Sequence, residues 1–287
     1  MDWTNKRILI TGGTGSIGRV LTDILTREYH QKEIVILSHS EKSLYKCKYA
    51  RFIQGDIADP QAVQIAMQGC HIVIHLAAMK HISICENNPA ETIRVNIEGS
   101  KNVYQTAMIC KPEIVMGMST DKAYGIPCNI YGYTKAVMEQ LFGLGTNQSG
   151  GKTQFFCVRS GNVLDSSGSV TRIWRKQVVN SQPITITNPD MTRFWISLPG
   201  IARYIISRIE LEAKCPKCGK SIHMPKTGSS TIKKLADIFS DDQEIVGAKA
   251  NERFHETLNM TYSSHTNQWN LTTEELIAML KENEPYL

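Results

Sequence analysis

Long apolar runs are missing from this 287-residue chain, and none approaches the roughly 20 residues that a membrane-spanning helix needs. A block of like charge is missing too, because the 32 basic and 27 acidic residues behind the net charge of +5 are spread along the sequence. This balance suits a small anionic ligand and does not indicate nucleic acid as a partner. A strand-like run begins within six residues of Met1, so we expect no targeting segment, no membrane partner and a cytoplasmic location.

A second Cys-x-x-Cys pair is also missing. The eight cysteines are scattered, which fits a reducing compartment better than a disulfide framework. Cys215 and Cys218 form the one such pair, with His223 nearby, whereas structural zinc needs four ligands. We therefore expect no metal site and interpret the pair as reduced thiols in an exposed hairpin, with zinc as the alternative.

Repeats and low-complexity tracts are absent, and short apolar runs alternate with helical patterns of roughly 10 to 20 residues. This alternation predicts an α/β fold with a Rossmann-type, doubly wound parallel sheet. We predict a dinucleotide-binding domain over residues 1–162 that carries the catalytic residues. A smaller lobe over residues 163–287 is expected mainly to bind substrate and to be interleaved with the last strands of the sheet. The expected strands are residues 7–11, 33–37, 51–54, 72–76, 113–118 and 152–159, and a long helix is expected over residues 89–110.

The first expected strand runs into a glycine-rich turn, TGGTGSIG, which satisfies both the GxGxxG and the looser GxxGxxG spacing. A helical apolar face follows, so the turn opens a helix whose N-terminus can hold a phosphate. We expect this turn to bind the pyrophosphate of a dinucleotide cofactor. Its predicted contacts are Gly12, Thr14, Gly15, Ser16, Ile17 and Gly18.

The end of the second expected strand bears on the choice between NAD and NADP. An acid there usually binds the ribose 2′-hydroxyl of NAD. Here Ser38, His39 and Ser40 occupy that edge, and the first acid, Glu41, comes late. The sequence therefore favours NADP over NAD, the alternative being that the loop turns away and specificity lies elsewhere. Asp56 is expected to bind the adenine amino group, with a turn or cap residue as the alternative. Further cofactor contacts are expected from Ile57, Ala77, Ala78, Lys80, Tyr131 and Lys135.

The stretch STDKAYGIPCNIYGYTK, residues 119–135, follows the expected strand 113–118 at its carboxyl end, where open α/β sheets place their ligands. Tyr131 and Lys135 lie four residues apart and so share a helix face. A lysine near a tyrosine lowers the pKa of the phenol, which can then act as a general base. An isolated YxxxK is more often a surface pair, but this position favours catalysis. The candidate catalytic residues are Thr120, Asp121, Lys122, Tyr131 and Lys135.

The motifs TGGTGSIG, GDIAD, AAMKH, STDKAYG, PCNIYGYTK, GNV, GSV, MTRF and ERFHE occur in this order over nearly the whole chain. Together they resemble the extended short-chain dehydrogenase/reductases, and within them the UDP-N-acetylglucosamine 4,6-dehydratases of polysaccharide biosynthesis. Where those proteins have SRGSV, this chain has SSGSV, with Ser167 in place of the arginine. The substrate contacts implied by the resemblance are Lys80, His81, Asn162, Val163, Ser169, Val170, Thr192, Arg193, Glu252 and His255. For Lys80 and His81 a place on the rim is an equal alternative, and for Arg193 a structural ion pair is the competing account.

The resemblance implies an NADP-dependent lyase that dehydrates a UDP-sugar with inversion at C5 and that forms a homo-oligomer. Tyr131 with Lys135 would take the 4-hydroxyl proton while Thr120 orients that group. Lys122 would then remove the C5 proton if its pKa is lowered, and Asp121 would protonate the departing C6 hydroxyl. The alternatives are release of a 5,6-ene, 4- or 5-epimerisation of the same UDP-sugar, and a non-catalytic NADP-sensing regulator.

Overall fold

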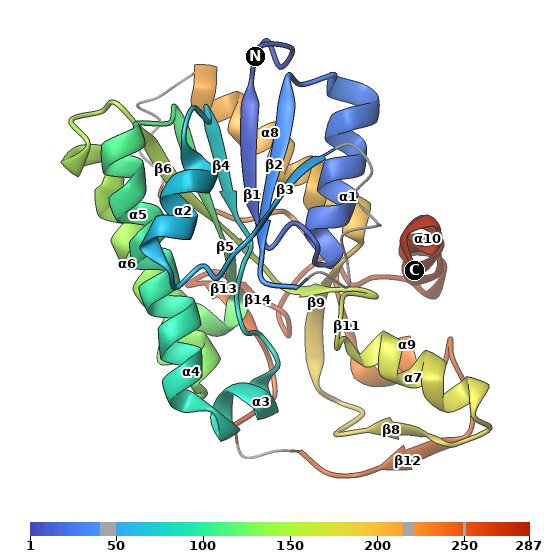
Figure 1. Ribbon diagram of the computed structural model, residues 1–287. Coiled ribbons are helices and arrows are strands. Elements are labelled where there is room, and N and C mark those ends of the chain that lie inside the picture. The colour runs from blue at the N-terminus through green and yellow to red at the C-terminus, as the bar shows by residue number, and fades with distance from the viewer. Residues whose placement is uncertain (41–49, 215–220, 249–250) are drawn as a thin grey trace.

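The computed structural model describes residues 1–40, 50–214, 221–248 and 251–287. Within them, seven parallel strands form one sheet in the order β3-β2-β1-β4-β5-β6-β10 (Figure 1). The order reverses between β1 and β4, which is the switch point where doubly wound folds bind dinucleotides. The predicted Rossmann-type sheet is therefore confirmed. Its strands are β1 (Arg7–Thr11), β2 (Glu33–Ser38), β3 (Ala50–Gln54), β4 (Ile72–His75), β5 (Ile114–Thr120), β6 (Gln154–Ser160) and β10 (Ile222–His223).

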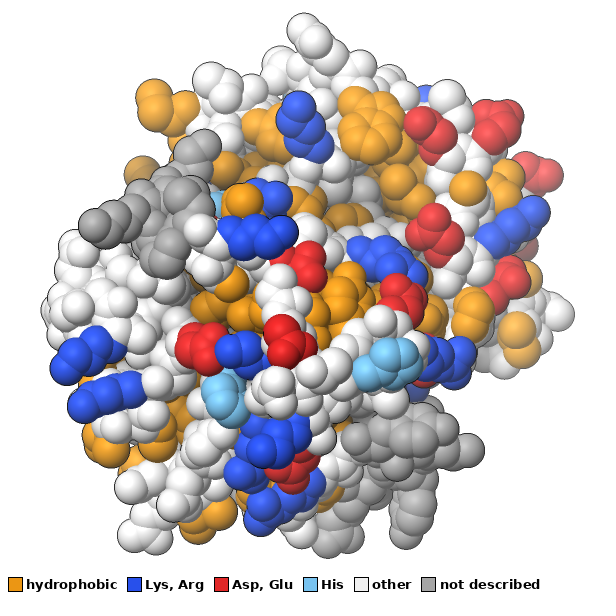
Figure 2. Space-filling view, turned by 90° about the horizontal axis from the view of Figure 1, so that it is seen from above, with side chains coloured by type: hydrophobic (Ala, Val, Ile, Leu, Met, Phe, Trp, Pro, Cys, Tyr) orange, Lys and Arg blue, Asp and Glu red, His pale blue; other side chains and the backbone are white. Residues whose placement is uncertain are grey.

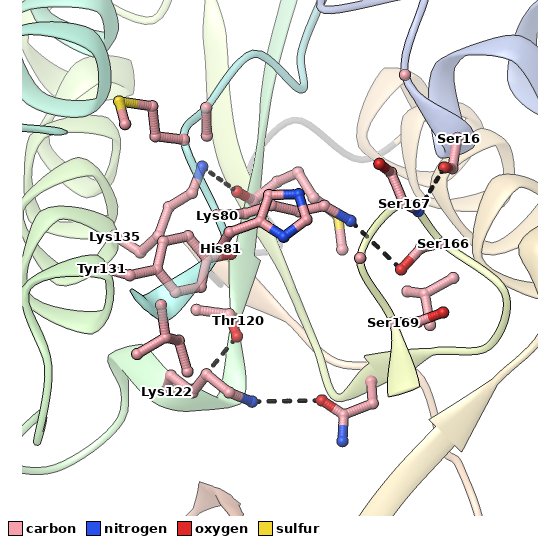
Figure 3. A pocket seen from close by; sticks show the side chains of 18 of the residues that line it. Ser16, Lys80, His81, Thr120, Lys122, Tyr131, Lys135, Ser166, Ser167 and Ser169 are labelled. Carbon is pink, nitrogen blue, oxygen red and sulfur yellow. Dashed lines mark hydrogen bonds between the residues drawn. The ribbon is translucent and has the colours of Figure 1, made fainter. Parts of the chain in front are cut away.

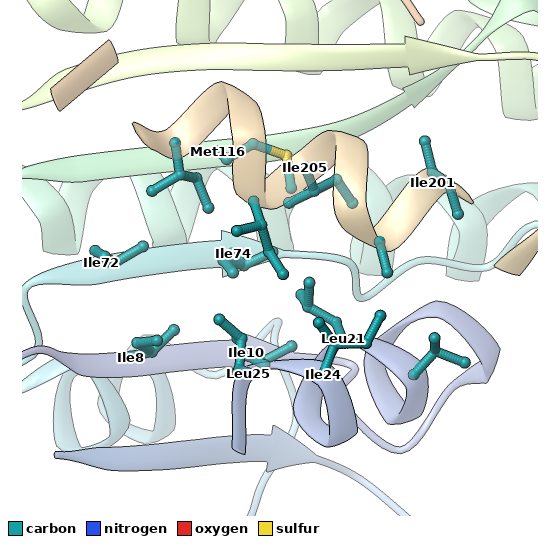
Figure 4. Packing of buried hydrophobic residues seen from close by; sticks show 14 of the residues in the cluster. Ile8, Ile10, Leu21, Ile24, Leu25, Ile72, Ile74, Met116, Ile201 and Ile205 are labelled. Atoms are coloured by element: carbon teal, nitrogen blue, oxygen red, sulfur yellow. The ribbon is translucent and has the colours of Figure 1, made fainter. Parts of the chain in front are cut away.

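Helices cover both faces of this sheet, so its central strands are apolar on both sides. One face packs against α1 (Ser16–Ile24) and α8 (Leu198–Lys214). Figure 4 shows this layer, in which isoleucines of β1 and β4 meet Leu21 and Ile24 of α1 and isoleucines of α8. The other face packs against α2 (Pro60–Met67), α5 (Gly99–Cys110) and α6 (Ile130–Gln148). Two buried layers hold the carboxyl ends of the strands in fixed positions.

The helix predicted over residues 89–110 consists of three consecutive pieces. These are α4 (Pro89–Ile93), a π-helical segment (Arg94–Glu98) and α5, and they follow the short α3 (Ile82–Asn87). The π segment carries the buried Asn96, whose amide accepts from Met79 N at 2.8 Å and donates to Met79 O at 2.9 Å. The same amide donates to Thr134 Oγ1 on α6 at 3.0 Å. This asparagine therefore ties the loop after β4 to the helix that carries Tyr131.

The smaller elements gather below the carboxyl ends of the strands (Figure 1). A buried cluster that includes Trp174, Trp195 and Leu271 holds them together. Two elements that follow residue 162, α8 and β10, belong to the layers of the seven-stranded sheet. The domain boundary at residue 162 stays a prediction. The lobe elements are β7 (Asn162–Val163), α7 (Val170–Val179), β8 (Ile184–Ile186), β9 (Thr192–Ile196), β11 (Ser229–Thr231), α9 (Ile232–Ala236), β12 (Gln243–Ile245), β13 (Thr257–Asn259), β14 (Tyr262–Ser263) and α10 (Thr273–Asn283).

The opposite end of the sheet, where the strands begin, is a face of mixed charge. Figure 2 shows basic and acidic side chains lying beside one another around apolar ones. Two of the ion pairs at the strand starts are Lys6–Glu113 at 2.6 Å and Arg7–Glu33 at 2.8 Å. No helix among the described residues is both long and apolar enough to span a bilayer.

Candidate active site

A cavity of about 1210 Å³ lies at the carboxyl ends of the strands, between the sheet and the smaller lobe. The predicted cofactor contacts that line it are Gly12, Thr14, Gly15, Ser16, Ile17, Gly18, Ser38, His39, Asp56, Ile57, Ala77, Ala78, Lys80, Tyr131 and Lys135. The predicted substrate contacts that line it are Lys80, His81, Asn162, Val163, Ser169, Val170, Arg193 and Glu252. Of the catalytic candidates, Thr120 and Lys122 also line it. Residues far apart in sequence thus share one cavity.

Three predicted contacts do not line this cavity: Ser40, Thr192 and His255. Thr192 Oγ1 lies 2.7 Å from His255 Nδ1, and the ring of His255 stacks on His265 with centroids 4.2 Å apart. The two side chains therefore connect β9 to the segment before β13 rather than facing a ligand. Glu41, Cys215 and Cys218 lie outside the described residues, so the interpretations that rest on them stay predictions.

The glycine-rich turn has the geometry that a pyrophosphate requires. Gly12 has a φ of +67°, and a Cβ there would lie 2.8 Å from the backbone of Ala77. The turn leads directly into α1, and the first residues of this helix line the cavity. The backbone amides at the N-terminus of α1 are therefore placed to bind a phosphate there. Thr14 Oγ1 in the turn lies 2.9 Å from Ser38 Oγ at the end of β2. A dinucleotide cofactor fits these residues, because Gly12 lets the turn run close to the backbone of Ala77 and no described side chain caps the N-terminus of α1.

Asp56 is less clearly a ligand of the adenine. Its carboxylate accepts from Ala58 N at 2.9 Å and lies 2.7 Å from Arg94 Nη2. These contacts lower the pKa of Asp56, although burial by itself raises it. These contacts agree with the alternative interpretation, in which Asp56 is a turn residue.

The loop of residues 164–169 closes the cavity from the lobe side. Ser167 N donates to Ser16 Oγ at 2.8 Å, and Lys80 Nζ donates to Ser166 Oγ at 3.3 Å. Figure 3 shows these serines opposite the catalytic candidates, with His81 between the two sides. Burial and the nearby Arg172 lower the pKa of Lys80 to about 8. The loop thus places hydroxyl groups over the N-terminus of α1, where Ser166 meets the amine of Lys80.

Tyr131 and Lys135 lie on one face of α6, as the sequence predicts, but their electrostatics differ from the expectation. Lys135 Nζ donates to the carbonyl of Met118 at 2.8 Å, and burial lowers its pKa to about 8. The pKa of Tyr131 rises to about 12, because burial outweighs the opposing effects of Lys122 and of a hydrogen bond with Thr120. The expected depression of the phenol pKa by Lys135 is therefore corrected: in this arrangement Tyr131 holds its proton.

Lys122 is the centre of a buried ionic cluster. Its Nζ lies 3.0 Å from Asp121 Oδ1 and 3.2 Å from Glu256 Oε1, and it donates to Asn162 Oδ1 at 3.3 Å. Burial lowers the pKa of Lys122, but the two carboxylates outweigh burial and hold it above its ordinary value. The lowered pKa on which the base role of Lys122 depends is thus not present in this state.

Asp121 lies behind the cavity wall rather than on it. Its side chain is fully buried, and it is not among the residues that line the cavity. Its Oδ1 accepts from Thr120 Oγ1 at 2.9 Å and from Lys122. Asp121 can therefore exchange protons with the cavity through the Thr120 hydroxyl, which does line it.

A family model described as polysaccharide biosynthesis protein matches residues 8–275. The chain belongs to this family. A UDP-N-acetylglucosamine 4,6-dehydratase (inverting) from Campylobacter jejuni subsp. jejuni serotype O:23/36 (strain 81-176) is 36% identical over 273 residues, 92% of this chain and 80% of that one. A UDP-glucose 4-epimerase from Rickettsia rickettsii (strain Sheila Smith) is 35% identical over 274 residues, 89% of this chain and 78% of its own.

The crystal structure of Pen from Bacillus thuringiensis superimposes with a TM-score of 0.88 at 28% identity and covers 98% of this chain and 99% of that one. The fold is also that of a dTDP-glucose 4,6-dehydratase from Streptomyces venezuelae with NAD and TYD bound, at a TM-score of 0.79, 17% identity and 98% coverage of both chains. The resemblance to extended short-chain dehydrogenase/reductases is confirmed.

In this polysaccharide biosynthesis protein, Arg193 forms the structural ion pair that was the alternative to a substrate contact. It lies 3.1 Å from Glu252 and donates to the carbonyls of Thr192, Phe254 and Arg253. Sequence reasoning missed Glu256, which lines the cavity and contacts Lys122. The signal was present in the ERFHE motif, whose last residue is Glu256.

Proposed function

We propose that this protein is a nucleotide-sugar 4,6-dehydratase that acts on UDP-N-acetylglucosamine with NADP and inverts C5. The observation that carries the proposal is Lys122 between two buried carboxylates, beside Thr120 and Tyr131. Removal of water across C5 and C6 needs a base and an acid in addition to the groups that oxidise C4. An epimerase working only at C4 gives such a cluster no acid–base task. The 36% identity to an inverting 4,6-dehydratase supports the same conclusion.

The residues of the chain have these roles in the proposal. Bound NADP supplies the hydride acceptor for oxidation at C4 and the hydride that later returns to C6. Thr120 and Tyr131 bind the 4-hydroxyl, and its proton passes through the Thr120 hydroxyl to Asp121 Oδ1, 2.9 Å away. Protonated Asp121 then supplies the proton with which the C6 hydroxyl leaves as water. Lys122 takes the C5 proton and later returns one to C5, while Lys135 positions the nicotinamide side of the cavity.

A second candidate is a 4-epimerase, because the chain is also 35% identical to a UDP-glucose 4-epimerase. Incubation with UDP-N-acetylglucosamine in deuterated water, followed by NMR of the product, separates the candidates. We expect a 4-keto-6-deoxy sugar with deuterium at C5. A 5,6-unsaturated sugar, or a 4-epimer with unlabelled C5, would contradict the proposal in favour of those alternatives. Tight NADP binding without any product would favour a regulator.

Two further proposals rest on the sequence alone: the protein works in the cytoplasm, and it forms a homo-oligomer. Light scattering of the purified protein during size-exclusion chromatography checks the oligomer, and a monomeric mass at micromolar concentration would contradict it.

A further inference from the structure

The buried cluster around Lys122 holds two carboxylates for one amine. Asp121 and Glu256 are 0% and 1% exposed, and each has one carboxylate oxygen, Oδ2 and Oε2, without a hydrogen-bond partner among the described residues. Buried polar atoms are normally satisfied, so this imbalance calls for a physical explanation. Lys122 Nζ already contacts both carboxylates, so a proton acceptor for a free amine on Lys122 is present within the cluster.

The two carboxylates differ in how well they hold a negative charge. Asp121 Oδ1 accepts hydrogen bonds from both Thr120 and Lys122, which stabilise its ionised form. Among the described residues, Glu256 Oε1 pairs with Lys122, and Glu256 Oε2 lies 3.9 Å from Arg253 Nη1. Glu256 is therefore the less stabilised anion and the better proton acceptor. It also lines the cavity, whereas Asp121 does not.

We propose, building on the dehydratase function proposed above, that Glu256 accepts the proton that Lys122 has to lose before its amine can take the C5 proton. The Nζ–H bond of Lys122 breaks as the Oε1–H bond of Glu256 forms. This transfer leaves both side chains neutral. The free amine removes the C5 proton and later returns a proton to C5. Glu256 then gives its proton back to Lys122. Glu256 acts through Lys122 and is a positioning residue of the reaction.

This role has a defined pH dependence. The charged groups that face Glu256 are Lys122 and Asp121 after β5, Arg193 on β9, and Arg253 in its own segment. Burial raises the pKa of Glu256 more than its cationic neighbours lower it. Below that pKa Glu256 already carries a proton and cannot accept another. Exchange at C5 is therefore expected to slow as the pH falls through the pKa of Glu256.

The test uses the full chain with NADP and UDP-N-acetylglucosamine in deuterated water. Glu256→Gln keeps the size of the side chain but cannot accept the proton. We expect it to form reduced nicotinamide on mixing, seen by absorbance, while deuterium incorporation at C5 slows by about 100-fold or more. Glu256→Asp restores a carboxylate and is expected to recover part of the exchange. The acid limb of the exchange rate should be lost in Glu256→Gln and kept in Glu256→Asp.

Glu212→Gln is the matched control, because Glu212 is also a buried glutamate but pairs with His223 on the far side of β6. It should lower the melting temperature without changing exchange at C5. Wild-type exchange and an unchanged acid limb in Glu256→Gln, with a wild type that dehydrates, would overturn this inference alone. Glu256→Asp behaving no better than Glu256→Gln would overturn it too. A wild type that produces only the 4-epimer would overturn the proposed function and this inference together.

Discussion

At the scale of single residues, Tyr131 and Lys135 share a face of α6 but have pKa values shifted in opposite directions. Burial disfavours the charged form of each group, so the pKa of the Tyr131 phenol rises to about 12 and the pKa of the Lys135 amine falls to about 8. Both side chains are therefore close to neutral at moderately alkaline pH. In the proposed mechanism the phenol therefore keeps its proton and binds the 4-hydroxyl beside Thr120, and it does not stand ionised before the substrate arrives.

Tyr131→Phe should abolish oxidation at C4 while leaving the fold intact. The change removes one hydroxyl from an unchanged ring, and with it the hydrogen bond that positions the Thr120 hydroxyl for the proposed proton transfer. A positioned proton-transfer group contributes about 100- to 10,000-fold, so the rate of nicotinamide reduction should fall by that range. Stopped-flow absorbance measures the rate, and NADP titration checks that the cofactor still binds. Turnover close to wild type would remove Tyr131 from the mechanism.

Lys80 gives a prediction for pH. Its pKa of about 8 means that the amine is charged below pH 8 and neutral above it. If Lys80 binds the substrate diphosphate, the affinity for UDP should fall as the pH rises through about 8. A charged hydrogen bond contributes roughly 1.5–3 kcal/mol, so the loss should be about 10- to 100-fold.

Calorimetric titration of UDP into the NADP-bound protein at pH 7 and pH 9 measures this change. Lys80→Met is the control, since it should bind weakly at both values and show no step near pH 8. An identical pH step in Lys80→Met would assign the titration to another group and leave Lys80 on the rim.

At the scale of elements, the sequence predicted the strands and helices that local patterns determine. It missed the features that depend on pairing with distant strands or side chains. Apolar runs placed the first strands within two residues of their observed bounds. The strand predicted over residues 113–118 continues through Ser119 and Thr120, because these polar residues pair with Arg159 and Ser160 of β6. Composition alone does not report such a partner. The π segment at 94–98 is likewise set by contacts of Asn96 with distant residues.

The closing loop offers a test at this scale. Gly168 has a φ of +72°, and a Cβ at this position would overlap the imidazole of His81. Gly168→Ala should therefore displace the loop or the ring, and a left-handed backbone adds about 1–2 kcal/mol of strain. We expect weaker binding of both NADP and UDP, measured by titration, with little change in the other elements.

The double variant Gly168→Ala with His81→Ala separates the two causes. Removing the ring relieves the overlap but not the backbone strain, so part of the affinity should return. No difference between Gly168→Ala and wild type would mean that the loop does not close the cavity.

At the scale of the molecule, the site joins segments that the sequence separates widely. The residues 119–135 could be predicted because one strand and one helix carry them. Glu256 lies 134 positions after Lys122 in the sequence and reaches it only when the lobe folds against the sheet. Its place in the site could therefore not be predicted from a local pattern. Thr192 and His255 failed to reach the cavity for the converse reason, because they bind each other within the lobe. The order of the motifs along the sequence predicts which residues belong to the site. It predicts less readily which of these residues face the ligand.

The same arrangement makes cofactor binding a property of the whole fold. A ligand that binds only the folded state at 100 times its Kd adds about 2.7 kcal/mol to stability. For a chain of this size each kcal/mol raises Tm by about 2–4 °C, so saturation should raise it by roughly 5–10 °C. NADP should give the larger rise, because Ser38 and His39, which line the cavity at the end of β2, carry no carboxylate that would repel a 2′-phosphate. Thermal melts with NADP and NAD at equal concentration measure the difference.

His39→Asp supplies the decisive comparison, because it adds the acid that NAD-specific sites usually carry at this strand end. In this variant the carboxylate should repel the 2′-phosphate and accept from a free 2′-hydroxyl, so the rise with NADP should shrink while the rise with NAD grows. The His39→Asn variant keeps the size without the charge and should change neither strongly. If wild type responds more to NAD than to NADP, the edge formed by residues 38–40 does not select the cofactor, and the preference proposed for this protein is reversed.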